Sequence, residues 1–176
     1  MDIARRAKSV RRAWEPGVDL PARPSKGNRR ELEQAWIAQL EARGLYHFLP
    51  QPPDAVPPQV YVAVDQFNAG SFWDCHETLE EVWLETTYPL RFVYHALIKV
   101  AVGFHHLGRH NCHGARVKLS DGVRLLRLFP AVYMGVHTRQ LLADTSAWLA
   151  RIEGEARLDW AALDTLPRPT ILTSPM

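Results

Sequence analysis

The chain has 176 residues, a formal net charge of +2 and 47% hydrophobic residues. This length is enough for one domain with a hydrophobic core of its own, and no apolar run of about eighteen residues predicts a membrane span. The two cysteines, Cys75 and Cys112, lack the spacing of a zinc knuckle or a redox pair, which argues against a disulfide framework. We therefore expect a cytoplasmic protein without a secretory signal and without a membrane partner.

The charge is unevenly distributed along the chain. Residues 1–30 contain nine Lys and Arg side chains against three acids. We predict a basic arm and linker over residues 1–28, followed by a single helical domain over residues 29–176. The arm could contact nucleic-acid phosphates through its basic side chains. It has no DNA-reading motif and few aromatic residues, so a solvated arm is the favoured interpretation. Its basic side chains before the first proline are Arg5, Arg6, Lys8, Arg11 and Arg12.

The first predicted elements are separated by prolines and glycines. Residues 28–43 have helical spacing of apolar side chains, and residues 50–58 are rich in proline and therefore extended. A short helix is predicted over residues 59–68, and Gly70 suits the turn after it. Ser71 followed by Asp74 resembles a capping box for the next helix, which should end between residues 86 and 89.

The remaining elements are also predicted to be helical. Residues 90–108 are apolar almost all round, which is typical of a helix buried on most sides. Asn111 is a suitable N-cap for a helix over residues 112–129, on which Gly114 and Gly122 permit close approach of another backbone. A last helix is predicted over residues 138–152, with the tail packing along the bundle.

No alternating strand pattern and no repeat of fixed period is visible. The predicted fold class is therefore all-α, a compact bundle of three long central helices plus flanking helices.

One predicted helix carries a histidine in the middle of its apolar stripe. On a helical wheel His76 falls among the hydrophobic positions, and Glu80 lies one turn further on at the margin of that stripe. A titratable pair aimed at a core needs partners, because burying polar groups without them costs free energy. The other residues of the stripe are Phe72, Cys75, Leu79, Val82 and Trp83.

Two sequence blocks resemble a known family. The first reads F-N-x-G-x-F-W-x-x-H-E-x-L-E-x-x-W over residues 67–83, and the second runs from Leu97 through His106 to Asn111, Gly114 and Ala115. In this order and separation they are similar to the domain of unknown function 309 family, over about residues 60–130. The resemblance implies a compact all-helical domain and supplies no activity.

The first interpretation of this cluster is structural. His76 would donate to Glu80 or to a backbone carbonyl, and His106 or Asn111 would complete a polar network that fixes the helix packing. In that case the domain is a structural or protein-interaction module. Apolar faces could also support a homo-oligomer.

The second interpretation is a site for a divalent transition metal. His76 and Glu80 present a nitrogen and an oxygen on one helical face, and His106, or else His95, could supply a third ligand from the next helix. A metal-assisted hydrolase is the most concrete enzyme that such a site suggests. The pattern lacks the second histidine of the His-Glu-x-x-His motif.

The third interpretation is metal-free acid–base catalysis or binding of a small ligand. His76 with Glu77 or Glu80 forms a His–carboxylate pair, and these three residues are the catalytic candidates. Lys99 could bind an anion. His95 and Asn111 join Lys99 as candidate ligand contacts, which places the expected site between the His76 helix and the helix over residues 90–108.

Overall fold

The computed structural model describes residues 31, 34, 37, 38, 55–86, 90–154 and 158–175. Within them the chain forms α3 (Pro58–Asn68), α4 (Phe72–Glu85), α5 (Arg91–Gly108), α6 (Cys112–Leu126), α7 (Thr138–Glu153) and α8 (Trp160–Thr165). The predicted all-α class is confirmed. The basic arm and His47 lie outside the described residues, as does most of the predicted helix over residues 28–43.

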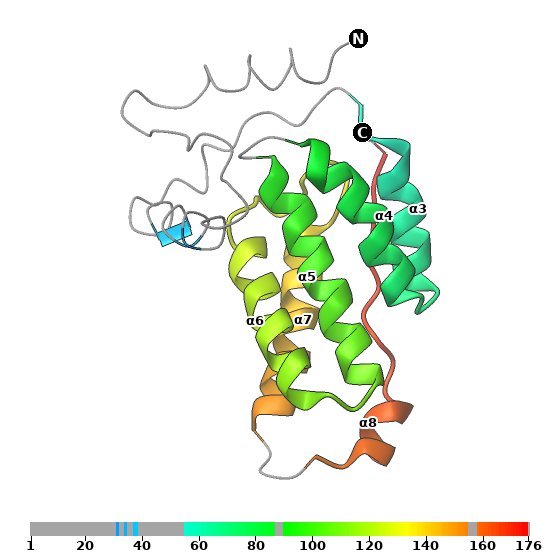
Figure 1. The fold of residues 1–176 in the computed structure, drawn as a ribbon, viewed down its shortest axis with the longest axis vertical. Helices are drawn as coiled ribbons and strands as arrows, with labels where there is room; N and C mark the ends of the chain where they lie inside the picture. Colours follow the sequence, from blue (N-terminus) through cyan, green and yellow to red (C-terminus); the bar gives the residue numbers. More distant parts are fainter. Residues whose placement is uncertain are drawn as a thin grey trace.

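The bundle is built around α5. Helices α4, α5 and α6 follow one another as antiparallel neighbours, α3 lies beside α4, and α7 packs behind α6 (Figure 1). The C-terminal segment after α8 returns along the bundle toward α3 (Figure 1). Within the described residues no helix combines the length and the apolar character needed to cross a membrane.

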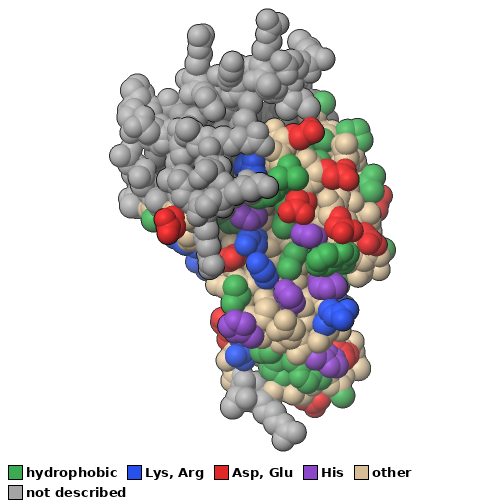
Figure 2. All heavy atoms as spheres, viewed as in Figure 1, with side chains coloured by type: hydrophobic (Ala, Val, Ile, Leu, Met, Phe, Trp, Pro, Cys, Tyr) green, Lys and Arg blue, Asp and Glu red, His purple; other side chains and the backbone are tan. Residues whose placement is uncertain are grey.

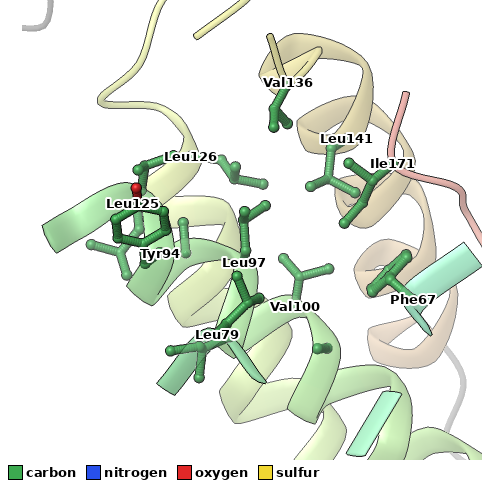
Figure 3. Close-up of a cluster of buried hydrophobic side chains, with 14 of the residues drawn as sticks. Phe67, Leu79, Tyr94, Leu97, Val100, Leu125, Leu126, Val136, Leu141 and Ile171 are labelled. Carbon is green, nitrogen blue, oxygen red and sulfur yellow. The ribbon is translucent and has the colours of Figure 1, made fainter. Parts of the chain in front are cut away.

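The core fills the space between these helices. Buried side chains from α3, α4, α5, α6 and α7 meet there, together with Val136 and Ile171 from the segments outside the helices (Figure 3). Phe104 on α5 is fully buried, and its ring lies within ring-contact distance of Phe67, Phe72 and Trp148, at 6.1, 5.7 and 6.0 Å between centroids. Aromatic pairs at such distances add to the free energy of burial. Phe104 therefore packs α5 against α3, α4 and α7 at one point.

Helices α5 and α6 approach closely at two glycines. A Cβ added at Gly103 would lie 2.4 Å from Leu119 Cδ2, and one added at Gly122 would lie 2.8 Å from Val100 Cγ2. Both distances are far below van der Waals contact, so the two helices could not pack this tightly with larger residues. The predicted close approach at Gly122 agrees with this packing, whereas Gly103 was not singled out from the sequence.

Several predicted boundaries need correction. Helix α6 ends at Leu126 rather than at Phe129, because residues 127 and 128 continue as a turn. Ser71 stands at the N-cap of α4, but its side chain makes no capping hydrogen bond, so the predicted capping box with Asp74 does not form. Helix α8 was not predicted, since six residues are too few for a helical pattern to be visible.

Candidate functional site

His76 lies on α4 and is half-buried, at the edge of the core rather than among fully buried side chains as its place in the middle of the apolar stripe suggested. Its side chain is 17% exposed, and its Nε2 lies 3.7 Å from Glu80 Oε2, one turn further along the helix. The Nδ1 atom is buried and has no hydrogen-bond partner within the described part of the chain. A structural network would be expected to satisfy both ring nitrogens, so His76 does not behave as a fully satisfied packing residue.

An exposed tryptophan lies beside His76. Trp73 is 46% exposed, and its ring centroid lies 4.8 Å from the His76 ring on its own helix and 5.0 Å from the His105 ring on α5. The indole is thus held between two imidazoles while nearly half of its surface remains open to solvent. Histidines gather along the middle of this face over α5, with acidic side chains over α4 (Figure 2).

Helix α4 makes this region acidic on one side. Glu77 lies four residues after Trp73 and Glu80 seven residues after it, so the two carboxylates share the helical edge on which the indole stands. Helix α4 has no Lys or Arg among its residues. We name Trp73, His76, Glu77, Glu80 and His105 the indole cluster.

The candidate contacts on α5 have other partners. Lys99 Nζ lies 3.2 Å from Asp121 Oδ2 on α6, so its charge is compensated inside the protein. The His95 ring lies 5.2 Å from the Trp83 ring. His95, Lys99 and His106 are half-buried on α5, most of whose other residues are buried. Lys99 is thereby less suited to hold an anion than the sequence suggested.

His106 and Asn111 form a separate network at the start of α6. Asn111 Oδ1 accepts a hydrogen bond from the Gly114 backbone N–H at 2.9 Å, which caps the helix as predicted. Its amide nitrogen is therefore turned to His106 Nδ1, at 3.3 Å. Since an amide nitrogen only donates, His106 Nδ1 accepts and the ring proton lies on Nε2. A Cβ at Gly114 would come within 2.8 Å of both side chains, so this arrangement requires glycine.

The surroundings of His106 lower its pKa below the ordinary value. The main cause is burial of the ring, and the nearby His105 and Lys118 act in the same direction. A histidine whose pKa is lowered on folding binds protons more readily in the unfolded chain, so stability decreases as the pH falls below the ordinary value of 6.5. Between that value and the lower folded pKa, His106 therefore favours unfolding.

We expect His106→Gln to reduce the loss of stability on acidification. Urea unfolding at about pH 7.5 and about pH 5.5 should show a smaller difference in unfolding free energy for the variant than for the wild type, because the proton uptake of this residue on unfolding is gone. Equal differences for the two proteins, or a larger one for the variant, would contradict the assigned direction.

The three predicted metal ligands do not form one group. His76 and Glu80 are close, whereas His106 contacts Asn111. Among the residues that the structure describes, no three His, Cys, Asp or Glu side chains lie close enough together to hold a metal ion. Cys75 is fully buried and free, as expected for a core residue, and burial raises the pKa of its thiol to about 12.

Every residue of the indole cluster lies in a segment that matches a known protein family. Residues 60–117 match the family described as Domain of unknown function (DUF309). The sequence resemblance is thereby confirmed over α3, α4, α5 and the start of α6. The DUF309 description assigns no reaction or ligand, and no curated protein matches the chain.

Other polar residues of the DUF309 segment have structural roles. Asn68 donates to the Ile171 carbonyl at 3.0 Å and accepts from the Ile171 N–H at 2.7 Å, which holds the C-terminal segment against α3. Gly70 adopts a positive φ of 82° in the following turn, a conformation that favours glycine. Arg91 is buried with its guanidinium 3.8 Å from the Trp83 ring centroid, and it donates to the Thr86 carbonyl.

Sequence reasoning missed His105 and His110. The His105 ring contacts Trp73, whereas His110 lies 2.8 Å from Asp164 and stacks on Trp160 at 4.6 Å. His105 lies in the last turn of α5, where it meets Trp73 in the first turn of α4. No local pattern links His110 to α8, since the two segments are 54 residues apart.

Proposed function

We propose that the DUF309 segment is a binding module for a small organic cation with a planar apolar part, and that the indole cluster is its site. The observation that supports this most strongly is Trp73, an exposed indole held between His76 and His105 rather than packed into the core. Exposed aromatic faces attract cations through the negative potential of the ring. Aromatic side chains with one open face also supply contact area at low entropic cost.

The charges around the indole favour a cation over an anion. Glu77 and Glu80 stand on the same helical edge as Trp73, and Glu80 Oε2 lies 3.7 Å from His76 Nε2. The lysine that was expected to bind an anion is paired with Asp121 instead. A ligand that stacks on the indole and places its charge toward Glu77 or Glu80 would gain both a cation–π contact and a charge-assisted hydrogen bond.

The state of His76 also supports binding rather than packing. Its buried Nδ1 has no hydrogen-bond partner within the described residues, which costs free energy. Residues at binding sites often carry such a cost because they are kept for function rather than stability. His76 would then position the Glu80 carboxylate through Nε2 and support the indole with its ring.

Benzamidine and benzoate test this proposal as probes of equal shape and opposite charge. The indole N–H signal of Trp73, identified in ¹H–¹⁵N spectra through Trp73→Phe, should shift saturably with benzamidinium and not with benzoate. Trp73→Ala, for which binding is followed through the backbone amide signals, should weaken it about two- to fivefold, the exposed cation–π range. Glu80→Gln should also weaken it, while the control Glu85→Gln, at the far end of α4, should not.

Two results would contradict the proposed site. One is the absence of a saturable shift of the Trp73 signal with benzamidinium. The other is equal binding of benzoate, which would show that the carboxylates of α4 do not select the ligand charge.

A further inference from the structure

A pocket lies outside the DUF309 segment, between α7 and the chain that follows α8. It has a volume of about 350 Å³, which is within the range of pockets that hold small molecules. The chain after α8 forms one wall as it returns along the bundle (Figure 1), and α7 forms the other. The lining residues are Asp144, Ala147, Trp148, Arg151, Pro167, Arg168, Pro169 and Thr170.

Two arginines of this pocket share one indole. The Cζ atoms of Arg151 and Arg168 lie 5.4 and 4.5 Å from the ring centroid of Trp148, which is itself 6% exposed. Both guanidinium groups line the pocket beside this ring. Two positive charges that line one pocket repel each other, so an anion bound in that pocket would be favourable.

The two arginines differ in how far the protein already satisfies them. Arg168 donates to the Leu163 carbonyl at 3.1 Å and lies 3.6 Å from Asp164. Burial lowers the pKa of its guanidinium, and Asp164 opposes that effect. Arg151 is exposed, and within the described part of the chain it has no carboxylate or carbonyl partner. Arg168 is therefore a fixed charge, and Arg151 retains its hydrogen-bond donors for a ligand.

The other polar groups of the pocket are few. Asp144 contributes one negative charge, and its Oδ1 accepts a hydrogen bond from Gln140 at 3.0 Å. Thr170 is exposed and offers a hydroxyl group on the opposite wall. The lining side chains thus carry two positive charges and one negative charge, and the Trp148 indole is part of the α7 wall.

We propose that this pocket binds a small organic anion, a carboxylate or a phosphate ester, through the guanidinium groups of Arg151 and Arg168. Arginine is suited to this task because its planar fork donates two parallel hydrogen bonds to carboxylate or phosphate oxygens. The site is separate from the indole cluster and selects the opposite charge. The two proposals therefore stand or fall independently.

Isothermal titration calorimetry at low ionic strength tests the pocket with citrate, glycerol 3-phosphate and inorganic phosphate as probes. We expect saturable binding of citrate or of glycerol 3-phosphate, and the stronger of the two identifies the carboxylate or the phosphate class. Arg151→Gln should weaken that binding about tenfold, the effect of losing one charge-assisted hydrogen bond. Arg151→Lys should bind with intermediate strength, because it keeps the charge and loses the fork.

Arg139→Gln is the matched control, since Arg139 is exposed on the first turn of the same helix. Its affinity should equal that of the wild type, and Asp144→Asn should bind more tightly because one repelling charge is gone. No binding of any of the three probes to the wild type would overturn the proposal. Equal weakening by Arg139→Gln and Arg151→Gln would also overturn it, since the anion would then respond only to the total charge.

Discussion

Replacing Phe104 by alanine should lower the unfolding free energy by about 3–5 kcal/mol, the usual cost of truncating a buried phenylalanine. The side chain is fully buried, and its ring contacts Phe67, Phe72 and Trp148 from three other helices. Its removal leaves a cavity where α3, α4, α5 and α7 meet, and the surrounding rings can collapse into it only in part. Urea or thermal unfolding followed by circular dichroism measures the loss.

Two further variants make this result interpretable. Phe104→Leu should cost less than the alanine variant and gives a folded protein for measurement if the larger truncation prevents folding. Val117→Ala truncates a side chain that is 39% exposed and should change stability by no more than about 0.5 kcal/mol. A loss below about 1 kcal/mol for Phe104→Ala would show that Phe104 does not hold the bundle together.

Gly103→Ala should destabilise the protein by about 1–2 kcal/mol. The added methyl group would lie 2.4 Å from Cδ2 and 2.6 Å from Cγ of Leu119, which is fully buried, and 3.2 Å from the Leu119 backbone nitrogen. Overpacking of this kind costs about 1–3 kcal/mol, and the higher helix propensity of alanine offsets up to about 1 kcal/mol of that cost. Chemical unfolding of the variant measures the net value.

Gly108→Ala separates the two effects on the same helix. No atom lies within 4 Å of a Cβ added there, so only the gain in helix propensity remains, and stability should rise by up to about 1 kcal/mol. The two substitutions are chemically identical and should have opposite signs. If both raise stability, α5 and α6 can separate enough to accept the methyl group, and the close approach at Gly103 is not required.

The helices themselves were readable from the sequence because their apolar residues recur at helical spacing. The bounds of α3, α4, α5 and α7 agree with the predictions to within a few residues. Asn111 was recognised as a cap because its side chain acts within its own helix start. The capping box predicted at Ser71 was wrong because a residue type suited to capping does not always form the capping hydrogen bond.

The arrangement of the site was less predictable because it depends on contacts between helices. His76 and Glu80 share one helix, so their proximity followed from their spacing. The contact of Trp73 with His105 depends on how α4 and α5 are aligned, which local spacing does not determine. Lys99 was read as a free cation for the same reason, since Asp121 comes from another helix.

Polar contacts between residues far apart in the sequence were the hardest to predict. Asn68 and Ile171 are 103 residues apart, and their paired hydrogen bonds hold the C-terminal segment in place. Arg91 lies at the start of α5 and is buried against Trp83 of α4, a contact that no local spacing indicates. In both cases the partner is set by tertiary packing. Asn68 and Asn111 of the family blocks thus have structural roles, whereas the indole cluster is the proposed binding site.

If the indole cluster serves binding, His76 is kept for the ligand and not for folding. The most direct measurement is the unfolding free energy of His76→Leu beside Asn111→Ala, with the second as a polar residue of known structural role. We predict that His76→Leu leaves stability unchanged or raises it, because it removes a buried nitrogen without a partner. Asn111→Ala should cost about 1 kcal/mol through loss of the cap. A loss of about 1–3 kcal/mol for His76→Leu would instead place His76 in the packing of the bundle and contradict the claim.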